Sequence, residues 1–164
     1  MDGNSTGPAP PAPEAPRTLM TPGTRMLDEL RRYFAARPEL GVAAVYLFGS
    51  HAEGRAHRES DVDLGVLLRW DLEADRRGRF AVRLRLAGEL ERPAAPARPD
   101  VVILNDAPPL LGRHIVTAGT RIFLADAAAD HAYVRDVQLR AADLVPFLRR
   151  MRQLKLAALE RSSP

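Results

Sequence analysis

An unbroken run of apolar residues, Val42–Phe48, constrains the fold of this 164-residue chain more than any other feature. Such a run is typical of a central strand that is buried on both faces of a sheet. Gly49 and Ser50 end the run, and a stretch rich in glycine and charged residues follows. This stretch is predicted to be a loop that opens with a short helix over 51–55. A second strand is predicted from Asp61 to about Leu68. We therefore expect a core built around a sheet.

Helical spacing alternates with these strands along the rest of the chain. Residues 72–90 are predicted to be helical because Phe80, Val82, Leu84, Leu86 and Leu90 recur among arginines. Residues 93–99 are expected to be a linker. Alternating helices and strands predict an α/β (α+β) domain with one small sheet flanked by helices. The remaining predicted elements are helices over 24–36 and 126–159, a helical turn over 109–118, a strand over 100–104 and an edge strand over 121–124.

Composition excludes several classes of protein. The chain has no cysteine, so disulfide scaffolds, cysteine nucleophiles and thiolate metal sites are excluded. No apolar run approaches the roughly 18 residues of a transmembrane helix, so we expect no membrane partner. The 24 basic residues are nearly balanced by 21 acidic ones, so direct nucleic-acid binding is not expected.

The chain divides into two predicted parts. Residues 1–22 are rich in proline and poor in large apolar residues, which predicts a disordered leader. This leader lacks the basic start and apolar stretch of a secretory signal, and we expect a cytoplasmic protein. Residues 23–160 are predicted to form one domain that ends in a long helix.

Two carboxylates on one strand are the first chemical feature. Asp61 and Asp63 are separated by Val62, and residues two apart in a strand share a face about 6–7 Å from each other. Two such carboxylates repel each other unless a cation lies between them. Mg²⁺ prefers one or two carboxylates together with substrate phosphates.

Gly49 and Ser50 supply a complementary feature where the first strand ends. Glycine lets a phosphate approach the backbone closely, and serine adds a hydroxyl donor. Asp100 opens the third strand, and if that strand lies beside the second, three carboxylates meet and can hold two metal ions. Each feature alone also has a purely structural interpretation. The aspartate pair could lie at a solvent-exposed strand edge, Gly-Ser could form an ordinary turn, and Asp100 could simply be the first residue of a strand.

The spacing of these residues resembles the signature of the DNA polymerase beta-like nucleotidyltransferase superfamily, in particular its minimal MNT-type branch. Gly49-Ser50 is followed by ten residues and then by Asp61-Val62-Asp63. Softer matches follow at 100–105, 107–110 and 119–123, so the resemblance covers roughly residues 24 to 150. It implies a minimal nucleotidyltransferase fold with a small mixed sheet.

The resemblance also implies an activity and a partner. Proteins of this branch commonly act as antitoxins that transfer AMP from ATP to a tyrosine of a HEPN-domain ribonuclease toxin. Gly49 and Ser50 would then hold the triphosphate. Asp61, Asp63 and Asp100 would be the catalytic residues and the ligands of two Mg²⁺ ions. The partners implied are the toxin and ATP.

Two other functions remain open alongside this one. The chain could be an antitoxin that only binds its toxin, or a small-molecule nucleotidyltransferase of the aminoglycoside-modifying kind. Enzymes of the latter kind usually add a helical domain, for which the chain has too few residues. Glu53 also departs from the family pattern, which often has a basic residue there. His51 and His57 are assigned no role, because the carboxylates supply the chemistry.

Overall fold

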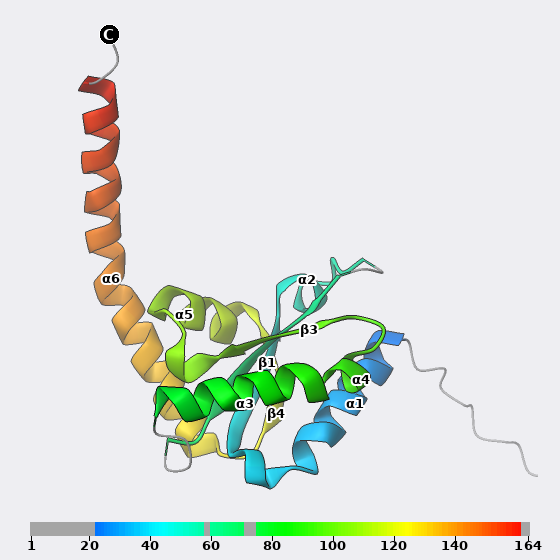
Figure 1. Ribbon diagram of the computed structural model, residues 1–164. Helices are drawn as coiled ribbons and strands as arrows, with labels where there is room; N and C mark the ends of the chain where they lie inside the picture. Colours follow the sequence, from blue (N-terminus) through cyan, green and yellow to red (C-terminus); the bar gives the residue numbers. More distant parts are fainter. Residues whose placement is uncertain (1–21, 58–59, 71–74, 162–164) are drawn as a thin grey trace, which may run out of the picture.

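The computed structural model describes residues 22–57, 60–70 and 75–161. The predicted leader lies outside these residues except for Pro22, and the proposed domain boundary stays a prediction. Four strands form one sheet in the order β3-β2-β1-β4 (Figure 1). The strands are β1 (Val42–Phe48), β2 (Val62–Leu68), β3 (Pro99–Ile103) and β4 (Thr120–Leu124).

The sheet is mixed, as the resemblance implies. Strand β1 runs antiparallel to both β2 and β4, whereas β2 and β3 are parallel. The two strands predicted from the apolar run and the aspartate pair are confirmed to within one residue. Strand β4 is confirmed as an edge strand, and β3 forms the other edge.

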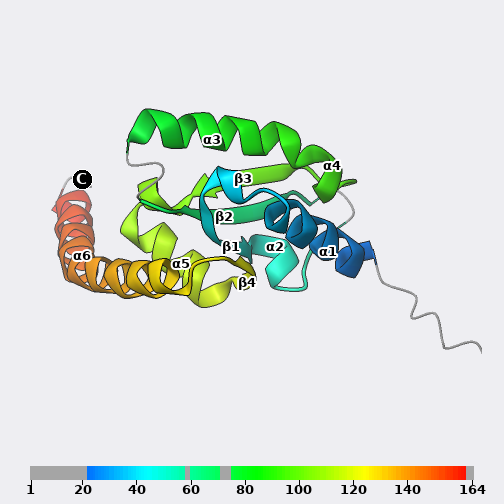
Figure 2. The ribbon, with the colours of Figure 1, turned by 90° about the horizontal axis from the view of Figure 1, so that it is seen from below.

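Helices cover both faces of the sheet (Figure 2). They are α1 (Pro22–Ala35), α2 (Gly49–Ala52), α3 (Arg76–Glu89), α4 (Glu91–Ala94), α5 (Pro109–Ala118) and α6 (Ala127–Arg161), with 3₁₀ helices at Pro38–Leu40 and Leu104–Asp106. Helix α3 lies over one face, and α5 with the start of α6 lies over the other. The predicted turn over 109–118 is thus a full helix, and the predicted linker over 93–99 overlaps the end of α4.

Alternating residues of β2 divide the core into two clusters. Val62, Leu64, Val66 and Leu68 pack on one face of the sheet with residues of α1 and α3. Leu67 packs on the other face with residues of α5 and α6. Because side chains alternate along a strand, Asp63 shares the face of Leu67. The carboxylate therefore points to the side covered by α5.

Helix α3 differs from its predicted apolar pattern. Phe80 and Leu84 are exposed, whereas Leu86 and Leu90 are fully buried. Residues spaced by two lie about 200° apart around a helix, so 80 and 84 cannot share a face with 82 and 86. Arg79 takes a place on the buried face and is only 7% exposed.

Helix α6 begins packed on the body of the molecule and ends away from it (Figure 1). Val137 and Ala141 are fully buried, but Phe147 and Met151 are exposed. Pro146 lies inside the helix, and the ribbon changes direction in its orange part. Within the described ranges, no helix is both long enough and apolar enough to span a bilayer.

Candidate functional site

Three neighbouring strands bring the predicted site residues to one end of the sheet. At the end of β1, Phe48 pairs with Asp63 at the start of β2. Asp63 in turn pairs with Asp100 at the start of the parallel strand β3. From the sequence, the three carboxylates were expected to meet only if the third strand lies beside the second. The parallel pairing of β2 and β3 meets that condition. Gly49, Asp63 and Asp100 thus lie in a row across the sheet.

Gly49 lies directly against the carboxylate of Asp63. Its φ of +67° is a left-handed conformation that side chains rarely adopt, and a Cβ atom built there would lie 2.2 Å from Asp63 Oδ2. Ser50 follows in the first turn of α2 and is partly buried. Only glycine at position 49 lets the backbone turn this closely past the carboxylate.

The three aspartates differ in exposure and create a strongly negative site. Asp61 precedes β2 and is exposed, Asp63 is partly buried, and Asp100 is exposed. Burial raises the pKa of the Asp63 carboxyl, and the charges of Asp100 and Asp61 raise that pKa further. His51 acts in the opposite direction and lowers the pKa of Asp63. The site therefore concentrates negative charge that the protein only partly offsets.

The carboxylate oxygens of Asp61, Asp63 and Asp100 are the kind of ligand that Mg²⁺ prefers, but these side chains do not point to one common position. In the part of the chain that the structure describes, no three His, Asp or Glu side chains are arranged as a metal-binding cluster. Asp100 Oδ1 instead lies 4.0 Å from Arg83 Nη2, at the outer side of β3. Asp61 and Asp100 are exposed, so their side chains are free to rotate toward Asp63. Hard carboxylate oxygens that repel each other are the chemistry that a divalent cation relieves.

Two residues near the carboxylates were not assigned a role from the sequence. His51 Nε2 lies 3.2 Å from the Ser60 carbonyl oxygen and its charge reaches Asp63. Arg83 donates from Nε to the Val101 carbonyl oxygen at 2.8 Å, which holds it beside Asp100. The sequence did contain a pattern that could have indicated Arg83. Arg76, Arg79 and Arg83 are spaced by three and four residues in a predicted helix, which places them on one helical face.

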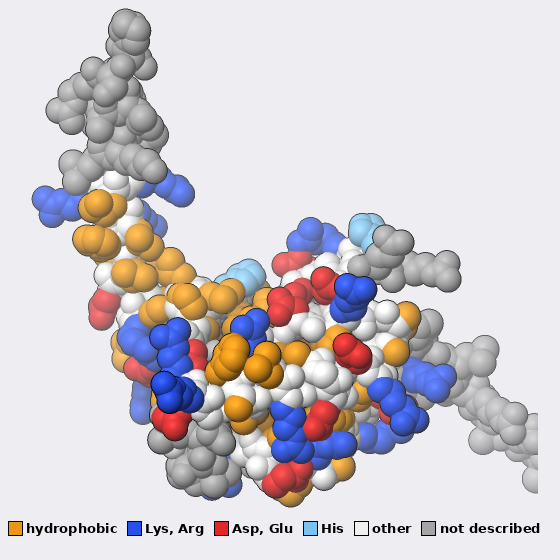
Figure 3. Space-filling view, in the orientation of Figure 1, with side chains coloured by type: hydrophobic (Ala, Val, Ile, Leu, Met, Phe, Trp, Pro, Cys, Tyr) orange, Lys and Arg blue, Asp and Glu red, His pale blue; other side chains and the backbone are white. Residues whose placement is uncertain are grey.

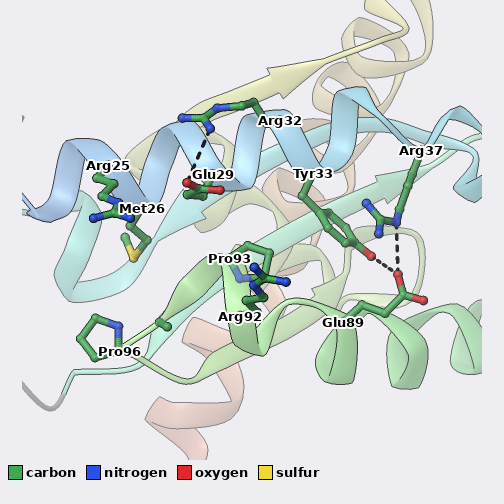
Figure 4. A pocket seen from close by; sticks show the side chains of 11 residues that line it. Arg25, Met26, Glu29, Arg32, Tyr33, Arg37, Glu89, Arg92, Pro93 and Pro96 are labelled. Carbon is green, nitrogen blue, oxygen red and sulfur yellow. Dashed lines mark hydrogen bonds and ion pairs between the residues drawn. The ribbon is translucent and has the colours of Figure 1, made fainter.

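A larger cavity of about 770 Å³ lies between α1 and α4 and contains none of these aspartates. Figure 4 shows that Tyr33 and Arg37 both reach Glu89 within it. The Tyr33 hydroxyl donates to Glu89 Oε2 at 2.7 Å, and Arg37 Nε lies 3.3 Å from the same oxygen. These contacts join α1 to the end of α3. We therefore interpret this cavity as a structural junction.

Comparison with known proteins agrees with this geometry. The family model described as polymerase beta, nucleotidyltransferase matches residues 28–128, which is more than half of the chain. The protein adenylyltransferase MntA of Shewanella oneidensis is 34% identical over 79 residues, covering 48% of this chain and 52% of MntA. The chain thus spans about half the length of the curated relative that it matches.

Two solved structures have a similar fold. A crystal structure of a toxin–antitoxin with AMP-PNP gives a TM-score of 0.53 at 24% identity and covers 81% of this chain and 98% of that one. A structure of tri-AMPylated Shewanella oneidensis HEPN toxin in complex with MNT antitoxin gives a TM-score of 0.50 at 19% identity, with coverages of 82% and 98%. At these identities the likeness establishes the fold. With the family match over residues 28–128, it follows that the chain belongs to the polymerase beta nucleotidyltransferase family.

Proposed function

We propose that this chain transfers AMP from ATP to a tyrosine hydroxyl of a HEPN-domain ribonuclease toxin and thereby acts as an antitoxin in the cytoplasm. The observation that carries the proposal is the row formed by Gly49, Asp63 and Asp100 at one end of the sheet. The family supplies the reaction class. The adenylyltransferase MntA and the AMPylated HEPN toxin of a similar complex support the nucleotide and the acceptor.

We assign the site residues to two roles. Asp61, Asp63 and Asp100 are the ligands for Mg²⁺, with room in the donor set for two ions. When bound, the metal supplies positive charge that offsets the carboxylates and the triphosphate. Gly49 and Ser50 hold the triphosphate, because they turn the chain at the end of β1 beside Asp63 and supply backbone N–H groups and the Ser50 hydroxyl as donors.

The proposed reaction is an in-line displacement at the α-phosphorus of ATP. The tyrosine oxygen forms a bond to that phosphorus, and the bond from the phosphorus to the oxygen that bridges to the β-phosphorus breaks. Pyrophosphate leaves, and the proton of the hydroxyl passes to Asp100. The carboxylate of Asp100 suits this role because it is exposed at the edge of the sheet.

Labelled ATP tests the proposal with purified components. The chain is incubated with Mg²⁺, a cognate HEPN toxin and ATP labelled in either the α- or the γ-phosphate. We expect the toxin to acquire the α-label and not the γ-label, and to lose its ribonuclease activity. A toxin that is inhibited without acquiring label would indicate an antitoxin that only binds. Label on an aminoglycoside in the absence of toxin would indicate a small-molecule enzyme.

A further inference from the structure

The order of the strands sets the side from which an acceptor reaches the site, and this step rests on the proposed function. Gly49 and Ser50 lie at the end of β1, and Asp63 and Asp100 follow on β2 and β3. In an in-line displacement the attacking oxygen and the leaving pyrophosphate lie on opposite sides of the phosphorus. If the triphosphate lies on the β1 side, the acceptor enters over the β3 edge.

A groove runs along this β3 edge. It has a volume of about 270 Å³ and lies between α3 and β3, continuing to the turn after β3. One end is formed by Arg83, whose Nη2 is 4.0 Å from Asp100. The other end is formed by Asp106 and Pro108. The residues of the groove that matter here are Arg76, Arg79, Phe80, Arg83, Val101 and Ile103.

The charges in the groove favour an acidic occupant. Arg79 is buried and already committed to Asp106, donating from Nε at 3.0 Å and from Nη2 at 2.7 Å. Arg76 and Arg83 are exposed along the same side of α3. Three arginines therefore line the groove with one carboxylate, Asp106, and the two exposed ones are accessible to a ligand, although Arg83 also lies 4.0 Å from Asp100. Guanidinium groups pair readily with carboxylates.

Aromatic side chains and the strand edge favour a polypeptide. Phe80 is 55% exposed in the groove, and Trp70, stacked 5.2 Å from the Arg79 guanidinium, is 53% exposed. Exposed aromatic residues beside arginines are typical of protein interfaces. On the face that carries α3 and β3, arginine side chains lie among hydrophobic ones (Figure 3).

The backbone of β3 could also contribute to peptide binding, because β3 is an edge strand. The Val101 carbonyl points to the outer side of β3, where it already accepts a hydrogen bond from Arg83 Nε at 2.8 Å, so an added segment must share or replace this bond. Backbone groups on this side of an edge strand can pair with an extended segment. From Asp100 to Ile103 the strand spans about 10 Å, the length of three residues.

We propose that the α3–β3 groove binds an extended, acidic segment of the protein substrate and presents its hydroxyl to Asp100. The segment adds to the β3 edge, its acidic side chains pair with Arg76 and Arg83, and an apolar side chain covers Phe80. The groove thus selects a polypeptide acceptor over a small molecule.

Charge reversal on α3 tests the groove. Arg76→Glu places a carboxylate in it, whereas Arg77→Glu makes the same change at an adjacent exposed position that does not line it. Both positions lie in the first turn of α3, where a carboxylate is favourable, so both variants should fold. The probe is a fluorescein-labelled peptide with one tyrosine between two runs of glutamate, followed by anisotropy.

We expect Arg76→Glu to bind this peptide about tenfold more weakly than Arg77→Glu does. In the transfer reaction, Arg76→Glu should raise the KM for the HEPN toxin with kcat and ATP binding retained. Equal peptide binding by the two variants would overturn the inference. So would tighter binding of a single-stranded RNA of the same charge, lost in Arg76→Glu, because it would identify a nucleic-acid groove.

The two proposals fail in different ways. If the peptide binds in the groove but wild-type protein transfers no AMP, the proposed function fails and the groove remains a peptide site. If the toxin is modified with the same KM by both variants, the transferase stands and the groove inference is wrong.

Discussion

Asp63 and Asp130 are aspartates withdrawn from water in contrasting surroundings. Asp130 is fully buried, yet the Tyr46 hydroxyl donates to its Oδ1 at 2.6 Å and Arg121 Nη1 donates to its Oδ2 at 2.6 Å. Asp63 is only partly buried, but this burial raises the pKa of its carboxyl, and the charges of Asp100 and Asp61 raise it further. The buried Asp130 is thus surrounded by hydrogen-bond donors, whereas Asp63 is surrounded by further carboxylates.

This difference sets a carboxylate that stabilises the fold apart from one that we propose to be functional. Around Asp130 the protein supplies its own donors, and the cluster joins β1, β4 and α6. Around Asp63 the chain places further negative charge, with His51 as an opposing influence. In the proposed function, a cation with a triphosphate offsets this charge.

The largest expected effect is loss of activity in Asp63→Asn. The amide keeps the shape of the side chain but removes a charged metal ligand, so AMP transfer should fall at least about a thousandfold. Transfer of label from α-labelled ATP to the HEPN toxin measures this. Asp136→Asn, at an exposed position on α6 that pairs with Arg140, is the control and should retain full activity. Substantial transfer by Asp63→Asn would remove this residue from the site.

Gly49→Ala should disturb the site by pushing on Asp63. The added Cβ would lie 2.2 Å from Asp63 Oδ2, so the carboxylate must move and transfer should fall about a hundredfold. Gly54→Ala is a matched control, because Gly54 has nearly the same φ, +68°, and no atom within 4 Å of its Cβ position. Both variants introduce a backbone cost of about 1 kcal/mol. Equal activities would show that the contact with Asp63 is unimportant.

Asp130→Ala should affect stability instead of chemistry. Removing the carboxylate leaves the buried Tyr46 hydroxyl and the half-exposed Arg121 without their acceptor, at a cost of about 2–3 kcal/mol in the free energy of unfolding. Tyr46→Phe, which removes one donor only, should cost about 1 kcal/mol. Urea denaturation followed by circular dichroism measures both. Unchanged stability in Asp130→Ala would mean that the cluster contributes nothing to folding.

The smallest expected effect is a gain of stability in metal-free Asp63→Asn. Since folding raises the pKa of Asp63, the stability linked to its protonated form is present below about pH 4 and is lost as the pH rises through the folded-state pKa. At pH 7 in a chelator, Asp63→Asn should therefore unfold at a higher temperature than wild type, and the difference should shrink toward acid pH.

Mg²⁺ extends this comparison. Adding it should raise the unfolding temperature of wild type and leave that of Asp63→Asn nearly unchanged, because binding to the native state stabilises it. A variant less stable than wild type at neutral pH in chelator would contradict the view that Asp63 carries an uncompensated charge.

The sequence predicted most where local pattern and tertiary environment agree. Strands β1 and β2 were predicted to within one residue, because an apolar run and an apolar–acidic alternation each have one simple explanation in a sheet. Helix α3 was less well described. Its apolar residues lie two apart, which gives no single helical face, and the buried Arg79 could not be anticipated before its partner Asp106 was placed.

In the candidate site too, local patterns could be predicted from the sequence, whereas contacts between distant segments could not. Asp61, Asp63 and Gly49 could be proposed from spacing alone, since they lie close along the chain. The pairing of Asp63 with Asp100 depends on the strand order, and the sequence gives that order only through family resemblance. The groove beside β3 joins segments distant in the chain, so no local pattern could reveal it.

The most direct test of the account is the intact mass of a HEPN toxin co-expressed with this chain. The toxin is purified after co-expression with wild type and with the Asp61→Ala/Asp63→Ala double variant. The account predicts a toxin heavier by one or more AMP units with wild type, and an unmodified toxin with the double variant. An unmodified toxin in both samples, or the same added mass in both, would contradict it.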